Sequence, residues 1–252
     1  MKNEFANTYQ SYKADINGII ERFDSSGEEF GNQDRNTIKL FEFNGQVLNV
    51  KSFRVPNIVN QIAYKFFRKS KAQRSFEYAN KLMEMGIGTP QPIAYYEFTS
   101  PFLFKRSFYI SEHLDCDLTY RELITNPNYP DHEEILRAFT RFTFELHEKG
   151  VHFLDHSPGN TLIKKVDDGY AFYLVDLNRM EFKTMSFEDR IKNFSRLSKF
   201  QPMVEVMSDE YAKCIGAPYE KVFKAMWGEI QGFQARFSRR RRLKRMFKPK
   251  RK

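Results

Sequence analysis

Two short alternating segments joined by Asn-Gly give the clearest structural pattern in this chain. Residues 37–43 (TIKLFEF) and 46–53 (QVLNVKSF) alternate apolar and polar side chains, which is the period of a half-buried strand. Asn44 and Gly45 lie between them, and both residue types tolerate the positive φ of a two-residue hairpin turn. The pattern therefore predicts a β-hairpin whose second strand includes Lys51.

The next segments change from a helical to a strand pattern. Apolar residues recur with helical spacing over 58–85, so we expect one long helix, which includes Glu77. Residues 86–98 (GIGTPQPIAYYEF) predict a proline-bounded loop that leads into a strand, and residues 101–114 (PFLFKRSFYISEHL) predict further strand. The N-terminal part is thus expected to combine a β-sheet with one helix.

Helical periodicity dominates after about residue 118. Residues 132–150 predict a long amphipathic helix that stops at Lys149-Gly150. The loop VHFLDHSPGN (151–160) follows, and TLIKKV and YAFYLVD around an Asp-Asp-Gly turn predict a second hairpin over 161–176. The periodicity over 186–238 is again helical.

Together these elements predict an α+β fold of two lobes. The N-lobe, residues 1–114, is expected to hold a small sheet and the long helix. The C-lobe, residues 115–238, is expected to be larger and mainly helical. At 252 residues the chain is long enough to bury a substantial core in both. We expect residues 239–252 to form a flexible basic tail.

The net charge of +9 is concentrated near the end of the chain. Residues 239–252 contain ten Lys or Arg and no acidic residue, so subtracting them leaves a net charge of −1 on residues 1–238. A second basic cluster, residues 64–74, has five positive residues and no negative one. Such clusters attract phosphate groups, which favours an anionic membrane surface as a partner. A simply solvated tail is the alternative, and no specific nucleic acid is expected.

Other features exclude several classes of protein. Cys116 and Cys214 are too few for a disulfide framework and lack metal-ligand spacing, which favours a reducing compartment. No apolar run approaches the roughly 20 residues of a spanning helix. The N-terminal segment lacks the apolar region of a signal peptide. We therefore expect a cytoplasmic protein.

Five polar residues follow one another in the order that phosphoryl transfer requires. Lys51 lies in a predicted strand, Glu77 in a helix, Asp155 and Asn160 in one loop, and Asp176 at the end of a hairpin. Such a transfer needs a Lys on the nucleotide phosphates, a Glu that holds it, and an Asp that takes the proton of the attacking hydroxyl. An amide and a carboxylate supply the oxygen ligands that Mg²⁺ prefers. Each residue alone has an ordinary structural explanation, but the set predicts a kinase that uses ATP and Mg²⁺.

Several of these motifs also resemble a known family. VHFLDHSPGN followed by LVDLN resembles the catalytic and metal-binding loops of the kinase superfamily. LNVKSF and RSFEYANKLMEMGIGTPQPIAYYE are similar to the lipopolysaccharide kinase family of Gram-negative bacteria, which includes Kdo kinase and WaaP-type heptose kinase. The similarity covers roughly residues 35–200 and implies that the two predicted lobes form a protein-kinase-like fold.

The resemblance implies a role for each of the five residues. Asp155 would be the catalytic base, Asn160 and Asp176 the Mg²⁺ ligands, and Lys51 with Glu77 the pair that clamps the ATP phosphates. The implied acceptor is a Kdo or heptose sugar of lipopolysaccharide or Kdo-lipid A. The implied location is the cytoplasmic face of the inner membrane, as a peripheral protein.

The chain also departs from the kinase pattern. Leu177-Asn178 follow Asp176 in place of Phe-Gly, and no glycine-rich phosphate loop precedes Lys51. Residues 27–36 (GEEFGNQDRN) are the best candidate for that loop, with Arg35 as a phosphate contact, although a plain hairpin loop explains them as well. Three alternatives therefore stay open: an atypical protein kinase, an aminoglycoside-type small-molecule kinase, and a catalytically dead scaffold. The sequence predicts no oligomeric state.

Overall fold

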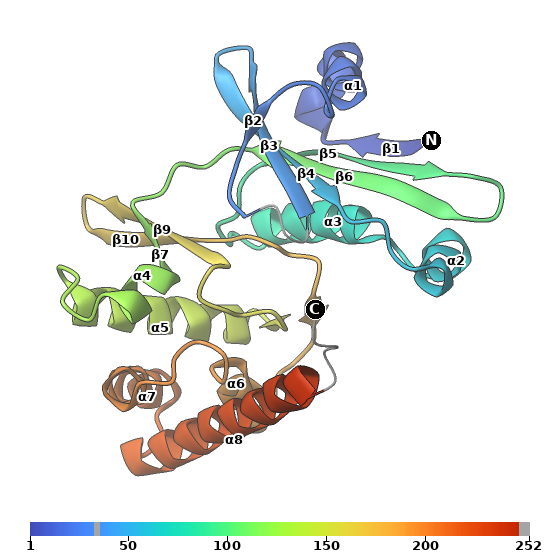
Figure 1. Ribbon diagram of the computed structural model, residues 1–252. Helices are drawn as coiled ribbons and strands as arrows, with labels where there is room; N and C mark the ends of the chain where they lie inside the picture. Colours follow the sequence, from blue (N-terminus) through green and yellow to red (C-terminus); the bar gives the residue numbers. More distant parts are fainter. Residues whose placement is uncertain (33–35, 247–252) are drawn as a thin grey trace. The chain divides into compact units, whose positions relative to one another are not determined.

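The computed structural model describes residues 1–32 and 36–246, which form two compact units (Figure 1). Unit 1 consists of Met1–Asp115 and Leu174–Arg179, and unit 2 of Cys116–Tyr173 and Met180–Lys252. The short segment Leu174–Arg179 returns to unit 1 after the second hairpin, and it includes Asp176. Arg35, the predicted phosphate contact, lies outside the described residues.

Unit 1 is built on a six-stranded sheet with the strand order β1-β5-β6-β4-β3-β2. Its strands are β1 (Lys2–Phe5), β2 (Glu28–Glu29), β3 (Asn36–Phe43), β4 (Gln46–Phe53), β5 (Pro92–Thr99) and β6 (Phe104–Glu112). Its helices are the 3-10 helix η1 (Asn7–Tyr12), α1 (Lys13–Glu21), α2 (Ile58–Phe66) and α3 (Lys71–Glu84). The sheet was predicted from the hairpin and strand patterns, whereas the elements before residue 36 were not.

The predicted first hairpin is confirmed as β3 and β4. Asn44 and Gly45 form its turn with φ of 49° and 78°, the positive values that the Asn-Gly pair favours. The strands pair antiparallel from Phe43 opposite Gln46 onward, which sets Ile38 opposite Lys51. The register of Lys51 thus follows from the turn.

The alternation of side chains along the strands assigns Lys51 to one face of the sheet. Lys51 pairs with Tyr109 of β6, which pairs with Tyr95 of β5, so the three side chains share a face. Phe76 of α3 packs on Tyr95 with ring centroids 5.5 Å apart, so this is the face that α3 covers. The neighbouring Tyr96 points to the opposite face and donates a hydrogen bond to α1. Figure 1 shows these two helices on opposite sides of the sheet.

The helix predicted over 58–85 is instead two helices, α2 and α3, so the prediction of one long helix was wrong. Asn57 begins α2 by accepting a hydrogen bond from the backbone of Asn60 at 3.0 Å. Ser70 begins α3 in the same way, accepting from the backbone of Gln73 at 3.0 Å. A second N-cap inside one apolar pattern starts a new helix because its side chain satisfies the first free backbone N–H groups.

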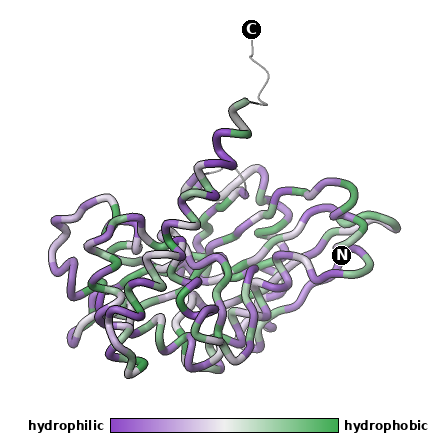
Figure 2. The backbone as a smooth tube through the Cα atoms, turned by 90° about the horizontal axis from the view of Figure 1, so that it is seen from below, coloured by the Kyte–Doolittle hydropathy of each residue, from purple (hydrophilic) through white to green (hydrophobic). Residues whose placement is uncertain are grey.

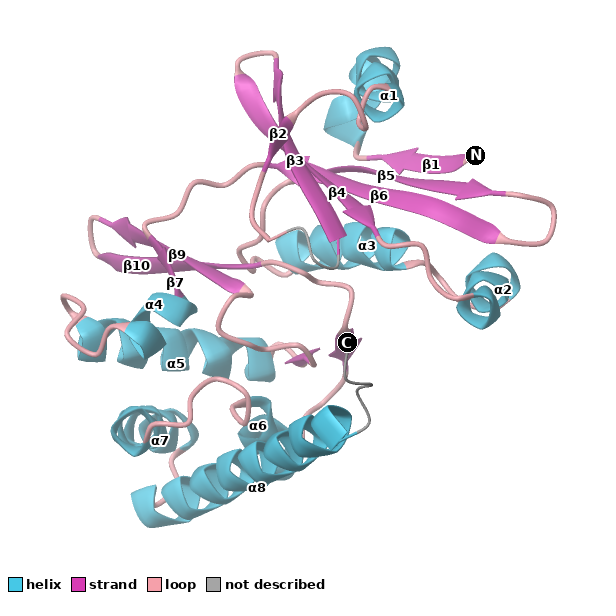
Figure 3. Ribbon diagram, in the orientation of Figure 1, coloured by secondary structure: helices cyan, strands magenta, loops and turns pink. Residues whose placement is uncertain are grey.

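Unit 2 is mainly helical and has two small sheets (Figure 3). The strand order is β10-β9-β7 in one sheet and β11-β8 in the other. Its strands are β7 (Leu118–Thr119), β8 (Val151–Phe153), β9 (Thr161–Val166), β10 (Gly169–Leu174) and β11 (Met180–Phe182). Its helices are α4 (Tyr120–Thr125), α5 (His132–Glu148), α6 (Phe187–Asn193), α7 (Gln201–Ile215) and α8 (Tyr219–Met246).

The core of unit 2 lies among α5, α7 and α8. Leu136 and Phe139 of α5 are fully buried, as are Val204 and Tyr211 of α7 and Val222 of α8. The predicted helix over 132–150 and the predicted second hairpin are both present, as α5 and as β9 with β10.

The C-terminal basic segment differs from the prediction. Instead of a flexible tail from residue 239, α8 continues as a helix to Met246. Arg239 to Arg242 are exposed, and Figure 2 shows hydrophilic turns toward the end of this helix. Residues 247–252 lie outside the described part. Over the described ranges, every helix is too short or too polar to cross a membrane.

Candidate active site

Lys51 and Asp176 form an ion pair in unit 1. The Lys51 Nζ atom lies 2.6 Å from Asp176 Oδ1, and the two side chains are 14% and 31% exposed. Leu174, the first residue of the segment that returns to unit 1, is bound to the loop before β5, because its N–H donates to the Gly88 carbonyl at 2.9 Å. The Thr89 hydroxyl also donates to the Leu174 carbonyl at 2.8 Å. These bonds bring Asp176 to β4.

Asp176 is held in an unusual backbone conformation. Its φ is +59°, in the left-handed region that residues with a side chain rarely adopt. The Asn178 amide donates to Asp176 Oδ1 at 2.9 Å. Burial raises the pKa of the Asp176 carboxyl, but the charge and hydrogen bond of Lys51 outweigh this effect, so the pKa lies below its usual value. Asp176 is therefore ionised at neutral pH.

Further cationic side chains surround this ion pair. Lys71 lies in the first turn of α3, where it interacts electrostatically with Asp176 and also with Lys51, Arg74 and Arg179. Burial lowers the pKa of Lys71, and the neighbouring Arg179 lowers it further. Lys51 and Lys71 act on the Asp176 carboxylate, and Arg74 and Arg179 act on Lys71, which leaves an excess of positive charge that suits an anionic ligand. The sequence analysis missed Lys71 and Arg179 because their meeting depends on tertiary structure.

In place of the predicted Lys51–Glu77 pair, the structure pairs Glu77 with two other residues. Glu77 Oε2 lies 2.8 Å from Lys69 Nζ, and the Gln73 amide donates to Glu77 Oε1 at 2.9 Å. Glu77 follows Lys71 by six residues, which places the two about 120° apart around the helix. Because Lys71 faces Asp176, Glu77 points to a different flank of α3.

In unit 2, Asp155 and Asn160 lie in the loop between β8 and β9. The Asn160 amide donates to the Asp155 carbonyl at 2.8 Å, so the five-residue spacing closes the loop on itself. Because the amide nitrogen is used in this way, the amide oxygen of Asn160 is the group that can accept a bond. Asp155 Oδ1 lies 2.5 Å from Arg196 Nη1, a partner that the sequence analysis did not identify.

A buried polar network supports this loop. His156 is buried between the rings of Phe139 and Phe153, with centroids 5.3 and 5.7 Å away. Burial lowers the pKa of His156 to about 3, so it is neutral at physiological pH. Asn193 of α6 donates to the Phe153 carbonyl at 2.8 Å, and its amide oxygen lies 3.1 Å from His147 Nε2. The loop that presents Asp155 therefore rests on a packed interior.

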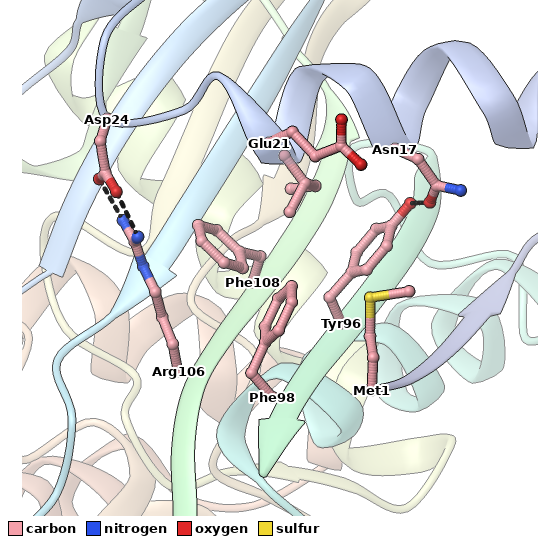
Figure 4. A pocket seen from close by; sticks show the side chains of 9 residues that line it. Met1, Asn17, Glu21, Asp24, Tyr96, Phe98, Arg106 and Phe108 are labelled. Carbon is pink, nitrogen blue, oxygen red and sulfur yellow. Dashed lines mark hydrogen bonds and ion pairs between the residues drawn. The ribbon is translucent and has the colours of Figure 1, made fainter. Parts of the chain in front are cut away.

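A cavity of unit 1 lies away from the Lys51–Asp176 pair. It has a volume of about 430 Å³, and its lining includes Phe98 and Phe108 (Figure 4). An ion pair between Arg106 and Asp24, 2.6 Å apart, lies at one side of it. The Phe108 side chain lies on the α1 face of the sheet, whereas Lys51 lies on the α3 face. This cavity is therefore not part of the ion-pair site.

Comparisons with known proteins identify the family of this chain. The sequence model of the lipopolysaccharide kinase (Kdo/WaaP) family matches residues 45–217, a range that includes all five candidate residues from Lys51 to Asp176. No curated protein sequence matches the chain.

A solved structure shares the fold. It is described as WaaP in complex with acyl carrier protein, has 15% sequence identity and a TM-score of 0.63, and the match covers 95% of this chain and 99% of that one. This likeness confirms the predicted fold class, a kinase-like α+β fold with a β-rich N-terminal sheet and a helical C-terminal part. Because the family model matches well over half of its residues, the chain belongs to the lipopolysaccharide kinase (Kdo/WaaP) family.

Proposed function

We propose that this protein transfers the γ-phosphoryl group of ATP to a sugar hydroxyl, of Kdo or heptose, in the inner core of lipopolysaccharide. The observation that carries the proposal is the ionised Asp176, paired with Lys51 among further cations, in a member of a lipopolysaccharide kinase family. A kinase needs this combination because catalysis of phosphoryl transfer rests mainly on charge placement.

Unit 1 would bind the ATP phosphates. Lys51 is the residue that the family resemblance assigns to them, and Lys71 and Arg179 add positive charge beside it. Lys71 is half-buried, so an interaction with a phosphate oxygen is screened less than on an open surface. Lys71 would contact the phosphates directly, and the pairing of Glu77 with Lys51 during the reaction stays a prediction.

Asp176 and Asn160 would hold Mg²⁺. Within the described ranges, no group of three or more His, Cys, Asp or Glu side chains could bind a metal on its own. One ionised carboxylate and one amide oxygen suit Mg²⁺, which keeps several waters and takes further oxygens from substrate phosphates. When bound, the ion neutralises charge on the phosphates of ATP.

Asp155 would act on the acceptor. Its carboxylate orients the sugar hydroxyl and takes its proton while the sugar oxygen forms a bond to the γ-phosphorus and the bond to the bridging β,γ-oxygen breaks. Arg196 holds one carboxylate oxygen of Asp155, and the Asn160 amide holds its carbonyl. Both contacts limit the orientations of Asp155, so that its free carboxylate oxygen would be held ready to take the proton of the sugar hydroxyl.

Replacing Lys71 by Met should raise the KM for ATP about tenfold, with a smaller change in kcat. A hydrogen bond to a charged group contributes about 1.5–3 kcal/mol, and a factor of ten is about 1.4 kcal/mol. Steady-state kinetics with varied ATP would measure this effect. Lys69→Met is a matched control, because Lys69 is an exposed lysine of the same segment that pairs with Glu77. Equal KM values in wild type and Lys71→Met would remove Lys71 from the phosphate site.

A panel of acceptors tests which sugar is phosphorylated. Kdo-lipid A, heptosylated core and their deacylated forms would each be incubated with Mg·ATP, and mass spectrometry would locate the added phosphate. We expect phosphate on a Kdo or heptose hydroxyl. Phosphate on protein or on an aminoglycoside, with none on these glycolipids, would favour the atypical or small-molecule kinase alternatives.

The acceptor class also sets the proposed location. A lipid-linked core sugar lies at an anionic surface, and the basic segments 64–74 and 239–252 suit peripheral contact with the inner membrane. WaaP is described in complex with acyl carrier protein, so such a carrier is the competing partner for these surfaces.

A further inference from the structure

Helix α2 exposes the apolar side chains that a surface helix normally buries. Ile58, Val59, Ile62 and Phe66 are between 43% and 71% exposed. At about 100° per residue, the four fall within an arc of about 100° and form one stripe. Surface helices of globular proteins turn such a stripe toward the core. None of the α2 residues is buried, so the usual arrangement is reversed here.

Two residues of α2 attach the helix to unit 1: Tyr64, opposite the stripe, and Lys65, at its edge. The Tyr64 ring packs on Phe104 of β6 with centroids 5.6 Å apart. Lys65 Nζ donates to the Thr99 hydroxyl of β5 at 3.2 Å. These contacts, together with the Asn57 N-cap, fix the rotation of the helix, so the apolar stripe is held outward.

The exposed apolar surface continues beyond the helix. Phe67, directly after α2, is 81% exposed, and Phe102 in the loop between β5 and β6 is 75% exposed. The contacts of Tyr64 and Lys65 with β6 and β5 place this loop beside α2, as Figure 1 also shows. Exposed aromatic and branched apolar side chains on adjacent segments mark an interaction surface.

The charged residues of the segment that carries this apolar surface are all basic. Residues 54–74 include six Lys or Arg and no Asp or Glu. Arg68 and Lys69 are exposed and follow Phe67 directly. An apolar helical stripe flanked by Lys and Arg is the pattern of a segment that lies in a membrane interface, where apolar side chains enter the acyl boundary and cations meet anionic head groups.

We propose that α2 and Phe67 form an interfacial anchor that inserts into the surface of an anionic bilayer. This anchor is the part of unit 1 that meets the membrane. It rests on the proposed function only for the identity of that membrane. The free energy of binding to the bilayer would come from insertion of apolar side chains as well as from charge. The basic segments 64–74 and 239–252 alone would predict a purely electrostatic contact with the bilayer. Lys69 is partly neutralised by Glu77, so Lys65, Arg68 and the exposed Arg54 are the cations of residues 54–74 that would meet anionic head groups.

Vesicle binding by the full chain tests the anchor. Wild type and the triple variant Ile62→Ser/Phe66→Ser/Phe67→Ser would be sedimented with phosphatidylglycerol–phosphatidylcholine vesicles. We expect the triple variant to bind at least about tenfold more weakly, because each buried apolar side chain contributes to partition. The matched control is Val166→Ser/Phe200→Ser, two exposed apolar residues of unit 2 with 45% and 42% exposure, which should bind as wild type does.

Two further measurements separate insertion from charge. In the Phe67→Trp variant, brominated lipids should quench the tryptophan fluorescence more strongly than they quench that of Trp227 in wild type. Residual wild-type binding should persist at high salt, because only the electrostatic part is screened. Thermal unfolding and activity on a deacylated, soluble acceptor should be unchanged in the triple variant, since its three substituted side chains are exposed.

Other results would overturn the anchor. Equal vesicle binding by wild type and the triple variant would do so, and so would absence of wild-type binding. Loss of binding to an acyl carrier protein in the triple variant, with vesicle binding unchanged, would assign α2 to a protein partner. Vesicle binding through α2 without any phosphoryl transfer would retain the anchor and reject the proposed function.

Discussion

Asp155→Asn is expected to lower kcat by about 10²- to 10⁴-fold, the range that general base catalysis contributes. The amide retains the shape of the carboxylate and can still accept a hydrogen bond from Arg196, but it cannot take the proton of the sugar hydroxyl. The affinity for Mg·ATP should change little, because Lys51 and Lys71 belong to unit 1 and Asp155 to unit 2. Turnover kinetics and nucleotide titration would measure the two quantities separately.

Asp168→Asn is the matched control for this variant. Asp168 is an exposed carboxylate in the turn between β9 and β10, in the same unit as Asp155. Its replacement should leave both kcat and nucleotide affinity at wild-type values. If Asp155→Asn kept a kcat within a few-fold of wild type, while remaining folded, Asp155 would not be the base.

Asp176→Asn is expected to lower kcat/KM for ATP by about 100-fold or more. The change removes the charge that pairs with Lys51 and removes a proposed Mg²⁺ ligand. Interactions with charged groups contribute about 1.5–3 kcal/mol each, so the loss of two such interactions exceeds the tenfold effect expected for Lys71→Met. Titration with Mg·ATP and with ATP in the absence of Mg²⁺ would show whether the loss depends on the metal.

Glu77→Gln is the control for Asp176→Asn, since Glu77 is a half-buried carboxylate of the same unit with a lysine partner. The structure predicts near wild-type kinetics, because Glu77 pairs with Lys69. If Glu77→Gln were as damaging as Asp176→Asn, then Lys51 would pair with Glu77 during the reaction. An unchanged Mg·ATP affinity in Asp176→Asn would contradict the metal role of Asp176.

Local patterns predicted much of the fold. The Asn44-Gly45 turn fixed the register of the first hairpin, and the apolar periodicity over 132–150 gave α5. Both signals lie within a few neighbouring residues and are therefore visible in the sequence. The split between α2 and α3 was missed, because the apolar pattern continues through Ser70 although its side chain caps a new helix.

The candidate site was predicted less completely. Motif spacing identified Asp155 and Asn160, which share one loop, and the order of elements identified Lys51 and Asp176. The partners Arg196 and Lys71 are 41 and 105 residues away from Asp155 and Asp176, and only the folded chain brings each to its carboxylate. The flank of α3 that faces Asp176 depends on how the helix is rotated, which the sequence does not show. The motif pattern therefore predicted Glu77, and not Lys71, as the residue of this helix that takes part in the site.

The departures from the kinase pattern also have a structural explanation. Asp176 itself adopts the positive φ, and Asn178 uses its amide to hold the Asp176 carboxylate. Leu177, in place of the usual Phe, is buried. The sequence Asp-Leu-Asn thus keeps an ionised carboxylate beside Lys51 without a glycine, which argues against the alternative of a dead scaffold.

The most direct test of the account is transfer of labelled γ-phosphate from ATP to Kdo-lipid A or heptosylated core, by wild type and Asp155→Asn in parallel, with and without Mg²⁺. We predict Mg²⁺-dependent labelling of one of these glycolipids by wild type, reduced in Asp155→Asn by about 10²-fold or more. Tight binding of Mg·ATP without labelling of either glycolipid would contradict the proposed acceptor. Absence of nucleotide binding altogether would contradict the kinase assignment itself.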